Sequence, residues 1–106
     1  MSVDIERRVS RLSIGTGGLS GPCVKPVALR MVHQVSRAVK MPVVGLGGIM
    51  NAQDAIEFMM CGASAVQICT ANFIDPGVTM KVIDGINTWC DEHGVKDVHE
   101  IIGAIR

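Results

Sequence analysis

Two short turns, each directly after an apolar run, contain the residue types in this sequence that could do chemistry. The first reads Val-Val-Gly-Leu-Gly-Gly-Ile-Met-Asn over residues 43–51, and the second reads Ile-Cys-Thr-Ala-Asn over residues 68–72. Backbone N–H groups that follow a strand and open a helix bind anions, because they point at the ligand and the helix dipole favours negative charge. Each turn is therefore a candidate phosphate-binding loop.

Gly47 and Gly48 suit the first loop because they carry no Cβ and adopt positive φ without strain. Asn51 follows them and is a good N-cap for the next helix, with Asp54 in the first turn of that helix. In the second loop, Cys69 and Thr70 would offer two backbone N–H groups and a hydroxyl. Together these groups predict a cradle for one phosphate.

Several interpretations of the glycines compete. A dinucleotide-binding G-x-G-x-x-G would use Gly45 and Gly47, but Met50 occupies its third position and no acidic residue stands near position 65. There is no G-K-S/T, so a P-loop is excluded. Two such loops on successive strand–helix units fit the phosphate site after strands 7 and 8 of a (β/α)8 barrel, with 71–75 as its short extra helix. Glycines that only permit a tight turn remain the alternative.

Other polar residues near these loops carry weaker signals. Lys25 is expected to be solvated, although it could face an anion across the glycine loop. Gln67, in the middle of an apolar run, either points into a barrel or is satisfied locally. The Cys69 thiol is expected to be a small residue that fits, because no neighbouring His or Lys would activate it. The three histidines are expected at the surface.

The composition describes one small domain. Of 106 residues, 48% are hydrophobic and 19% charged, and the formal net charge is zero. No basic stripe suggests nucleic acid or an anionic membrane as a partner, and no apolar run is long enough to span a membrane. The N-terminus lacks the apolar region of a signal peptide. We therefore expect a cytoplasmic protein.

The four cysteines, Cys23, Cys61, Cys69 and Cys90, include no C-x-x-C pair. This scatter argues against a metal site or a disulfide framework. Reduced and mostly buried thiols are the expectation.

The chain alternates strands with helices after an opening hairpin. Weak alternation predicts the hairpin over residues 1–14, and residues 15–22 form a glycine-rich loop. Apolar periodicity predicts helices over 26–40, 52–61, 80–90 and 98–105. In the third helix, the side chains predicted to face the core are Val82, Ile83, Ile86, Trp89 and Cys90. The short apolar runs at 41–47 and 64–69 predict strands buried on both faces.

This order predicts an α/β fold with a parallel sheet. Two parallel strands buried on both faces are not a self-sufficient architecture, so we expect either strands from elsewhere or a piece of something larger.

Three blocks of this sequence closely resemble the dihydroorotate dehydrogenase family, class 1B. They are residues 16–35, "TGGLSGPCVKPVALRMVHQV", residues 41–67, "MPVVGLGGIMNAQDAIEFMMCGASAVQ", and residues 70–73, "TANF". The resemblance implies an FMN-dependent (β/α)8 barrel that oxidises dihydroorotate to orotate in de novo pyrimidine biosynthesis. It implies that residues 1–106 are a partial FMN-binding barrel domain, the C-terminal portion. Residues 1–14 would then be a hairpin insert, and 15–106 would hold the last helices and strands 7 and 8.

The resemblance also assigns cofactor contacts. The family's FMN-contacting glycine in G-G-L-S-G-P corresponds to Gly21, its glycine pair after strand 7 to Gly47 and Gly48, and its Gly-Thr pair after strand 8 to Cys69 and Thr70. Cys69 departs from the family glycine. The backbone N–H survives this change, but a side chain is added near the FMN phosphate or ring.

The family's catalytic base is a cysteine in a C-P-N loop, and no cysteine here precedes Pro-Asn. No catalytic residue is therefore assigned, and Met1 is expected to correspond to an internal methionine of the family. The class implies a homo-oligomer and a partner subunit that carries FAD and an iron–sulfur cluster and reacts with NAD.

Two alternatives remain open. "VQICTA" also resembles the FMN barrel of dihydropyrimidine dehydrogenase. The other alternative is a non-catalytic module that self-associates through open sheet edges.

Overall fold

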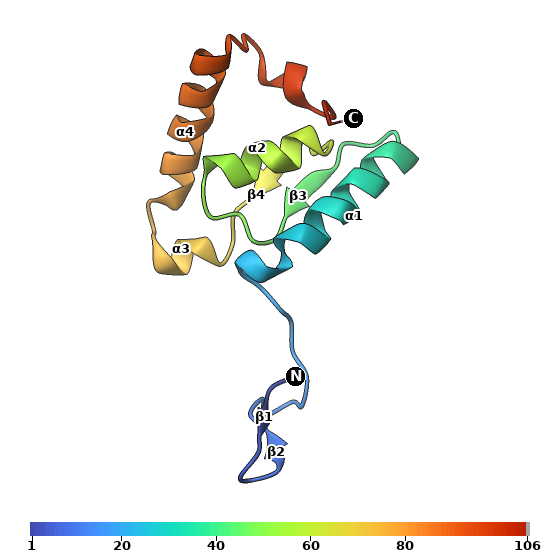
Figure 1. Cartoon of the computed structure of the whole chain (residues 1–106), viewed down its shortest axis with the longest axis vertical. Coiled ribbons are helices and arrows are strands. Elements are labelled where there is room, and N and C mark those ends of the chain that lie inside the picture. The colour runs from blue at the N-terminus through green and yellow to red at the C-terminus, as the bar shows by residue number, and fades with distance from the viewer. Residues whose placement is uncertain (106) are drawn as a thin grey trace.

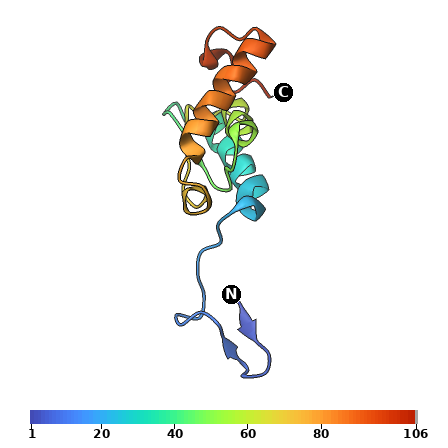
Figure 2. The same ribbon diagram turned by 90° about the vertical axis from the view of Figure 1, so that its left-hand side faces the viewer.

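The computed structural model describes residues 1–105. It shows an α/β unit from which an N-terminal hairpin projects on an extended linker (Figure 1). The turned view shows the same separation, with one long helix lying across the front of the unit (Figure 2). The elements in chain order are β1 Val3–Asp4, β2 Val9–Ser10, η1 Pro22–Val24, α1 Lys25–Ala38, β3 Val44–Leu46, α2 Ala52–Met60, β4 Ala65–Gln67, α3 Ala71–Ile74, α4 Val78–His93 and η2 Val98–Ile101.

The hairpin lies where the alternating apolar residues indicate one. Val3 pairs with Ser10 and Asp4 with Val9 in antiparallel register. Asp4 Oδ1 accepts hydrogen bonds from the N–H groups of Glu6 and Arg7 and so fixes the turn. Figure 1 shows this hairpin standing away from the helices, at the end of the linker.

The parallel sheet has two strands, with α2 as the connection between them. Val44 pairs with Ala65, Gly45 with Val66 and Leu46 with Gln67. The carboxyl ends of β3 and β4 therefore lie side by side, and the loops that follow them meet at one edge of the sheet. This positions the two candidate phosphate loops together.

One face of the sheet forms the core. Phe58 of α2 is fully buried, and a Cβ placed on Gly45 would lie 2.7 Å from its ring. Glycine at position 45 thus lets α2 pack directly on β3. Buried side chains that complete this core are Val32, Ile49, Ala55, Cys61, Ala63, Ala71, Val78 and Val82.

The other face of the sheet is open, which corrects the prediction that both faces are buried. Val44 is 51% exposed and Leu46 is 55% exposed, and both alternate with the buried Gly45. Alternation along a strand sends neighbouring side chains to opposite faces. Helix α2 covers one of those faces, and the described residues leave Val44 and Leu46 about half exposed on the other.

Two predictions about the C-terminal third were wrong in detail. Ile83 is 46% exposed instead of facing the core, while Val82 next to it is buried. The last helix is the 3-10 turn η2, Val98–Ile101, and does not continue to Ile105. Ile102 is extended and Gly103 has a φ of 72°, and the N–H groups of Gly103 and Ile105 donate to the carbonyls of Met59 and Met60 instead. Docking against the end of α2 thus replaces helical hydrogen bonds.

No helix among residues 1–105 combines the length and the apolar character needed to cross a membrane.

Candidate functional site

All five residues predicted to bind a phosphate cofactor line one groove. Its volume is about 500 Å³, and it runs from the open face of β3 and β4 to the start of α1. The predicted residues that line it are Gly21, Gly47, Gly48, Cys69 and Thr70. Residues 21 and 70 lie far apart in the sequence, so the fold has brought three separate loops together.

The first wall of the groove is the glycine turn after β3. Gly47 has a φ of 118° and Gly48 a φ of 76°, a region that favours glycine. A Cβ on Gly48 would lie 2.8 Å from the carbonyl oxygen of Gly21 and 2.9 Å from Cβ of Lys25. The glycine loop before α1 and the turn after β3 are therefore in direct contact, and only glycine allows this contact at position 48.

The turn leads straight into α2. Asn51 is the N-cap of this helix, as predicted, and its side chain accepts a hydrogen bond from the N–H of Asp54 at 3.0 Å. The positive end of the α2 dipole thus begins a few residues after Gly48.

The second wall is the turn after β4. Thr70 is the N-cap residue of the short helix α3, whose place at 71–74 matches the predicted extra helix. Asn72 braces this turn, because its Nδ2 donates to the carbonyls of Ile68 and Cys69 at 3.0 and 3.1 Å. These two hydrogen bonds close the turn around Cys69 and Thr70.

Both walls offer hydrogen-bond donors. Within residues 1–105, the N–H groups of Gly47, Gly48, Cys69 and Thr70 donate to no protein acceptor. Unpaired N–H groups beside a helix N-terminus form a concave anion-binding surface. The arrangement can hold an anion through backbone groups alone.

The Lys25 side chain is partly buried and ion-paired, which corrects the expectation of a solvated lysine. Its Nζ lies 2.5 Å from Asp54 Oδ1 and 2.9 Å from Glu57 Oε2. The anions that Lys25 contacts are thus two carboxylates of α2. The Asp54 carboxylate also accepts a hydrogen bond from the N–H of Met50, at 2.8 Å on Oδ2.

These contacts shift the pKa values of both Lys25 and Asp54. The hydrogen bond to Asp54, followed by the one to Glu57, raises the pKa of Lys25. Burial raises the pKa of Asp54, but the hydrogen bonds from Lys25 and from the Met50 N–H outweigh it, so the net pKa is lowered. Asp54 and Lys25 are therefore both charged over the whole neutral range.

Gln67 and two of the cysteines are exposed side chains. Gln67 is exposed on the open face of the sheet, beside its register partner Leu46, and lines the groove. Cys23 and Cys69 are exposed, so the expectation of mostly buried thiols was wrong for these two. No cluster of His, Cys, Asp or Glu that could hold a metal ion occurs among residues 1–105.

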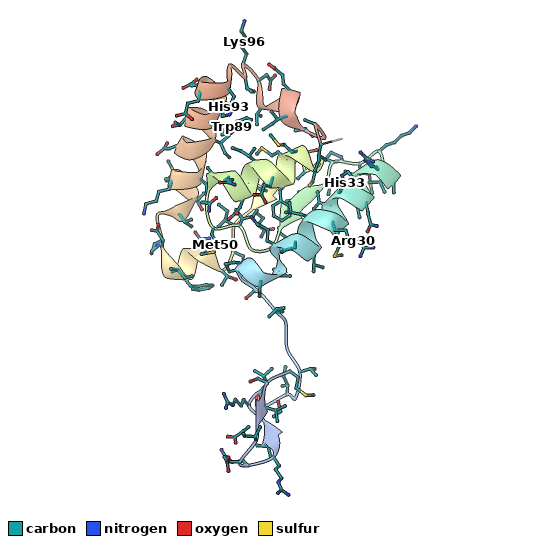
Figure 3. The ribbon with its side chains drawn as sticks, viewed as in Figure 1. Arg30, His33, Met50, Trp89, His93 and Lys96 are labelled. Atoms are coloured by element: carbon teal, nitrogen blue, oxygen red, sulfur yellow. The ribbon has the colours of Figure 1, made fainter. Side chains whose placement is uncertain are left out.

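His93 lies at the surface, as expected. Its ring stacks on Trp89, with centroids 4.2 Å apart, and its Nδ1 lies 2.8 Å from the Trp89 carbonyl oxygen. Figure 3 shows this pair on α4, away from Met50 and the candidate site.

Neighbouring parallel strands whose following loops line one groove occur in (β/α)8 barrel enzymes and also in open α/β sheets. The comparison with known proteins favours the barrel. The family model described as "Dihydroorotate dehydrogenase" matches residues 1–89. The chain belongs to the dihydroorotate dehydrogenase family.

Relatives and solved structures carry the same name. The chain is 64% identical over 105 residues to "Dihydroorotate dehydrogenase B (NAD(+)), catalytic subunit" of Parabacteroides distasonis, covering 99% of this chain and 34% of the relative. It is 55% identical to the protein of that name in Geotalea uraniireducens, with the same coverage. The crystal structure of the Eimeria tenella enzyme with ferulenol superposes with a TM-score of 0.79 at 28% identity, over 95% of this chain and 28% of that one.

The chain thus spans about a third of the length of the curated relatives it matches. The predicted fold class, α/β and a portion of a (β/α)8 barrel, is confirmed by these neighbours.

Sequence reasoning did not find the role of Asn72, and it named Lys25 only as a solvated lysine that could face an anion. The roles of Asn72 and Lys25 depend on contacts with carbonyl groups and carboxylates that sequence order does not reveal. The one signal in the sequence was a lysine beside a glycine loop. It indicated that Lys25 could face an anion, but it did not identify the anion.

Proposed function

We propose that this chain contributes the FMN-phosphate wall of a dihydroorotate dehydrogenase. The observation that carries the proposal is the convergence of Gly21, Gly47, Gly48, Cys69 and Thr70 on one groove, where the N–H groups of the last four have no protein acceptor among residues 1–105. A phosphate held there would receive hydrogen bonds from both turns and would lie near the N-terminus of α2.

The residues present fit the phosphate end of FMN. Gly47 and Gly48 leave backbone N–H groups without a covering Cβ, and Cys69 keeps its N–H although it adds a thiol. The apolar part of the groove, which includes Val44, Leu46 and Ala28, offers a surface for the rest of the cofactor. When bound, FMN supplies the hydride acceptor of the reaction.

The whole protein would oxidise dihydroorotate to orotate in pyrimidine biosynthesis. This chain's own residues would bind and orient the cofactor and keep the phosphate fixed. They would not remove the substrate proton, because none of the four cysteines precedes Pro-Asn. The names of the relatives favour this activity over that of dihydropyrimidine dehydrogenase, and they support a partner subunit that links the reaction to NAD. FAD and an iron–sulfur cluster would belong to that partner.

The test is a titration of the chain with FMN and, separately, with riboflavin, which lacks the phosphate. We expect FMN to bind at least tenfold more tightly, because charge-assisted hydrogen bonds to phosphate are each worth about 1.5–3 kcal/mol. Equal affinity for the two flavins would contradict a phosphate site. Dihydroorotate turnover by this chain alone would contradict the assignment of the base to other residues.

A second candidate, self-association, is favoured by the open face of the sheet. Val44 and Leu46, together with Val27 and Met31 of α1, are each more than half exposed around the groove. Apolar surface of this kind promotes pairing of chains. Sedimentation across a range of concentrations tests it. A monomer at every concentration would count against self-association and leave the FMN proposal intact.

A further inference from the structure

Lys25 connects the two loops that meet at the groove. It is the first residue of α1 and follows the Gly21 loop, while its partners Asp54 and Glu57 lie on α2. The Lys25 side chain is 23% exposed and that of Asp54 only 10%. The ion pair is thus partly buried, unlike the exposed pair of Lys81 with Asp75.

Asp54 in turn fixes the segment between the glycines and α2. One carboxylate oxygen binds Lys25 and the other accepts from the N–H of Met50, while the Asp54 N–H donates to the Asn51 side chain. With both oxygens engaged, the carboxylate holds Met50 and Asn51 in place. Gly48 lies two residues earlier, so its position depends on this bracing.

Lys25 also touches the loop through its own backbone. A Cβ on Gly48 would lie 2.9 Å from Cβ of Lys25 and 3.1 Å from its N. The glycine loop, Lys25 and Asp54 therefore form one packed assembly.

The assembly has an electrostatic cost. A buried carboxylate at the N-terminus of α2 stabilises the helix, but it also repels an anion bound at the same end. Asp54 and Glu57 together carry two negative charges, and Lys25 reduces their sum to one. Without Lys25, both charges would act on a phosphate in the groove.

We propose that Lys25 is a positioning residue for phosphate binding, which compensates the Asp54 carboxylate and thereby keeps the Met50–Asn51 segment and the glycine turn in their anion-binding arrangement. This inference rests on the proposed function, because it assigns a role in the same site. Lys25 acts through Asp54, whose carboxylate it engages directly.

The test uses four variants of the chain. Lys25→Met keeps the aliphatic stem and removes the charge, and Lys25→Arg restores the charge. Lys25→Met/Asp54→Asn returns the cluster to its wild-type net charge of minus one and keeps a side-chain oxygen that can accept the Met50 N–H. Lys96→Met is the matched control, because Lys96 is an exposed lysine at the far end of the unit from Met50 (Figure 3).

Two quantities are measured on each variant: the dissociation constants for FMN and riboflavin, and the hydrogen-exchange rate of the Met50 amide. We expect Lys25→Met to weaken FMN binding on the order of tenfold through the added repulsion, while riboflavin binding changes less than about twofold. The double variant and Lys25→Arg should recover most of the FMN affinity, and Lys96→Met should match the wild type. Exchange of the Met50 amide should be faster in Lys25→Met and unchanged in Lys96→Met.

Wild-type FMN affinity in Lys25→Met would overturn the inference, and so would a loss that is equal for FMN and riboflavin or is not rescued in the double variant. If the wild-type chain binds no FMN, the proposed function of this chain fails by itself. The hydrogen-exchange rate of the Met50 amide then tests the positioning role of Lys25. Equal exchange rates in the wild type and in Lys25→Met would overturn that role.

Discussion

Gly48 packs against the backbone of Gly21, so closely that a Cβ at position 48 would lie 2.8 Å from the Gly21 carbonyl oxygen. The contact joins the loop before α1 to the turn after β3, and Gly48 reaches it with a φ of 76°. A side chain at this position would meet both a steric and a conformational obstacle.

Gly48→Ala is therefore expected to lower the free energy of unfolding by about 2–4 kcal/mol, from the left-handed backbone and the close contact together. The matched control is Gly94→Ala, because Gly94 also has a positive φ, of 67°, but has open space around it. In Gly94→Ala the free energy of unfolding should fall only by the cost of the left-handed backbone, about 1–2 kcal/mol. Urea unfolding of both variants measures the difference, and equal losses would show that the contact with Gly21 is unimportant.

The crossing of α2 and α4 depends on small residues. A Cβ on Gly85 would lie 2.5 Å from Cβ of Ala52, so Gly85→Ala should push the helices apart despite the better helix propensity of alanine, about 1 kcal/mol. We expect a net loss of about 1–2 kcal/mol and a change in the fluorescence of Trp89, which borders the same hollow.

The double variant Ala52→Gly/Gly85→Ala is the matched test of that crossing. It adds a Cβ at position 85 and removes the Cβ at position 52 that the new one would meet. It should be more stable than Gly85→Ala alone. A single Gly85→Ala variant more stable than the wild type would contradict the close approach.

Asp54 should make the chain sensitive to acid. Its pKa is lowered in the folded chain, so its stabilisation is present above the pKa of an unfolded Asp, about 3.9, and is lost as the pH falls through the lower folded value. Asp54→Asn should lose about 2 kcal/mol near pH 7, and its difference from the wild type should shrink towards pH 3. Urea unfolding as a function of pH measures this.

Asp75→Asn is the control for the acid experiment. Asp75 also pairs with a lysine, Lys81, and that hydrogen bond lowers the pKa of Asp75, but the pair is exposed and should affect stability little. A pH dependence that is the same in Asp54→Asn and in the wild type would contradict the role of the buried pair.

The thiols should react in the order of their exposure. Cys23 and Cys69 are exposed, whereas Cys61 is buried and its burial raises the pKa of its thiol. Brief alkylation of the folded chain with iodoacetamide should therefore modify Cys23 and Cys69 before Cys61. Saturating FMN should slow the reaction of Cys69, which lines the groove, and leave Cys23 unchanged. Mass spectrometry of the peptides reads out each site, and a Cys61 that reacts as fast as Cys69 would contradict the packing.

Local sequence rules predicted several elements and the backbone geometry of two glycines, while the assignment of these glycines to a cofactor stays a prediction. Asn51 caps α2 because its side chain reaches the N–H of Asp54, an interaction within three residues of chain. Gly47 and Gly48 adopt positive φ, which glycine does without steric cost. Such features depend on neighbours in sequence, and a pattern can therefore indicate them.

Features that depend on distant neighbours were not predictable in the same way. The partners of Lys25 lie 29 and 32 positions further along the chain, so its sequence surroundings suggested a solvated side chain. Residues 102–105 leave the predicted helix because Gly103 and Ile105 donate to the end of α2. The apolar run of β3 indicated burial on both faces, but burial of Val44 depends on which elements pack there.

Backbone groups of the two turns are proposed to bind a flavin phosphate. Amide chemical shifts of the isotope-labelled chain, followed during titration with FMN and then with riboflavin, report on each of these groups individually. We predict that FMN shifts the amide signals of Gly47, Gly48, Cys69 and Thr70 and leaves those of the distant Gly94 and Lys96 in place, and that riboflavin moves the four site signals much less. Saturating FMN that leaves the four site amides unmoved, or riboflavin that moves them equally, would contradict the claim.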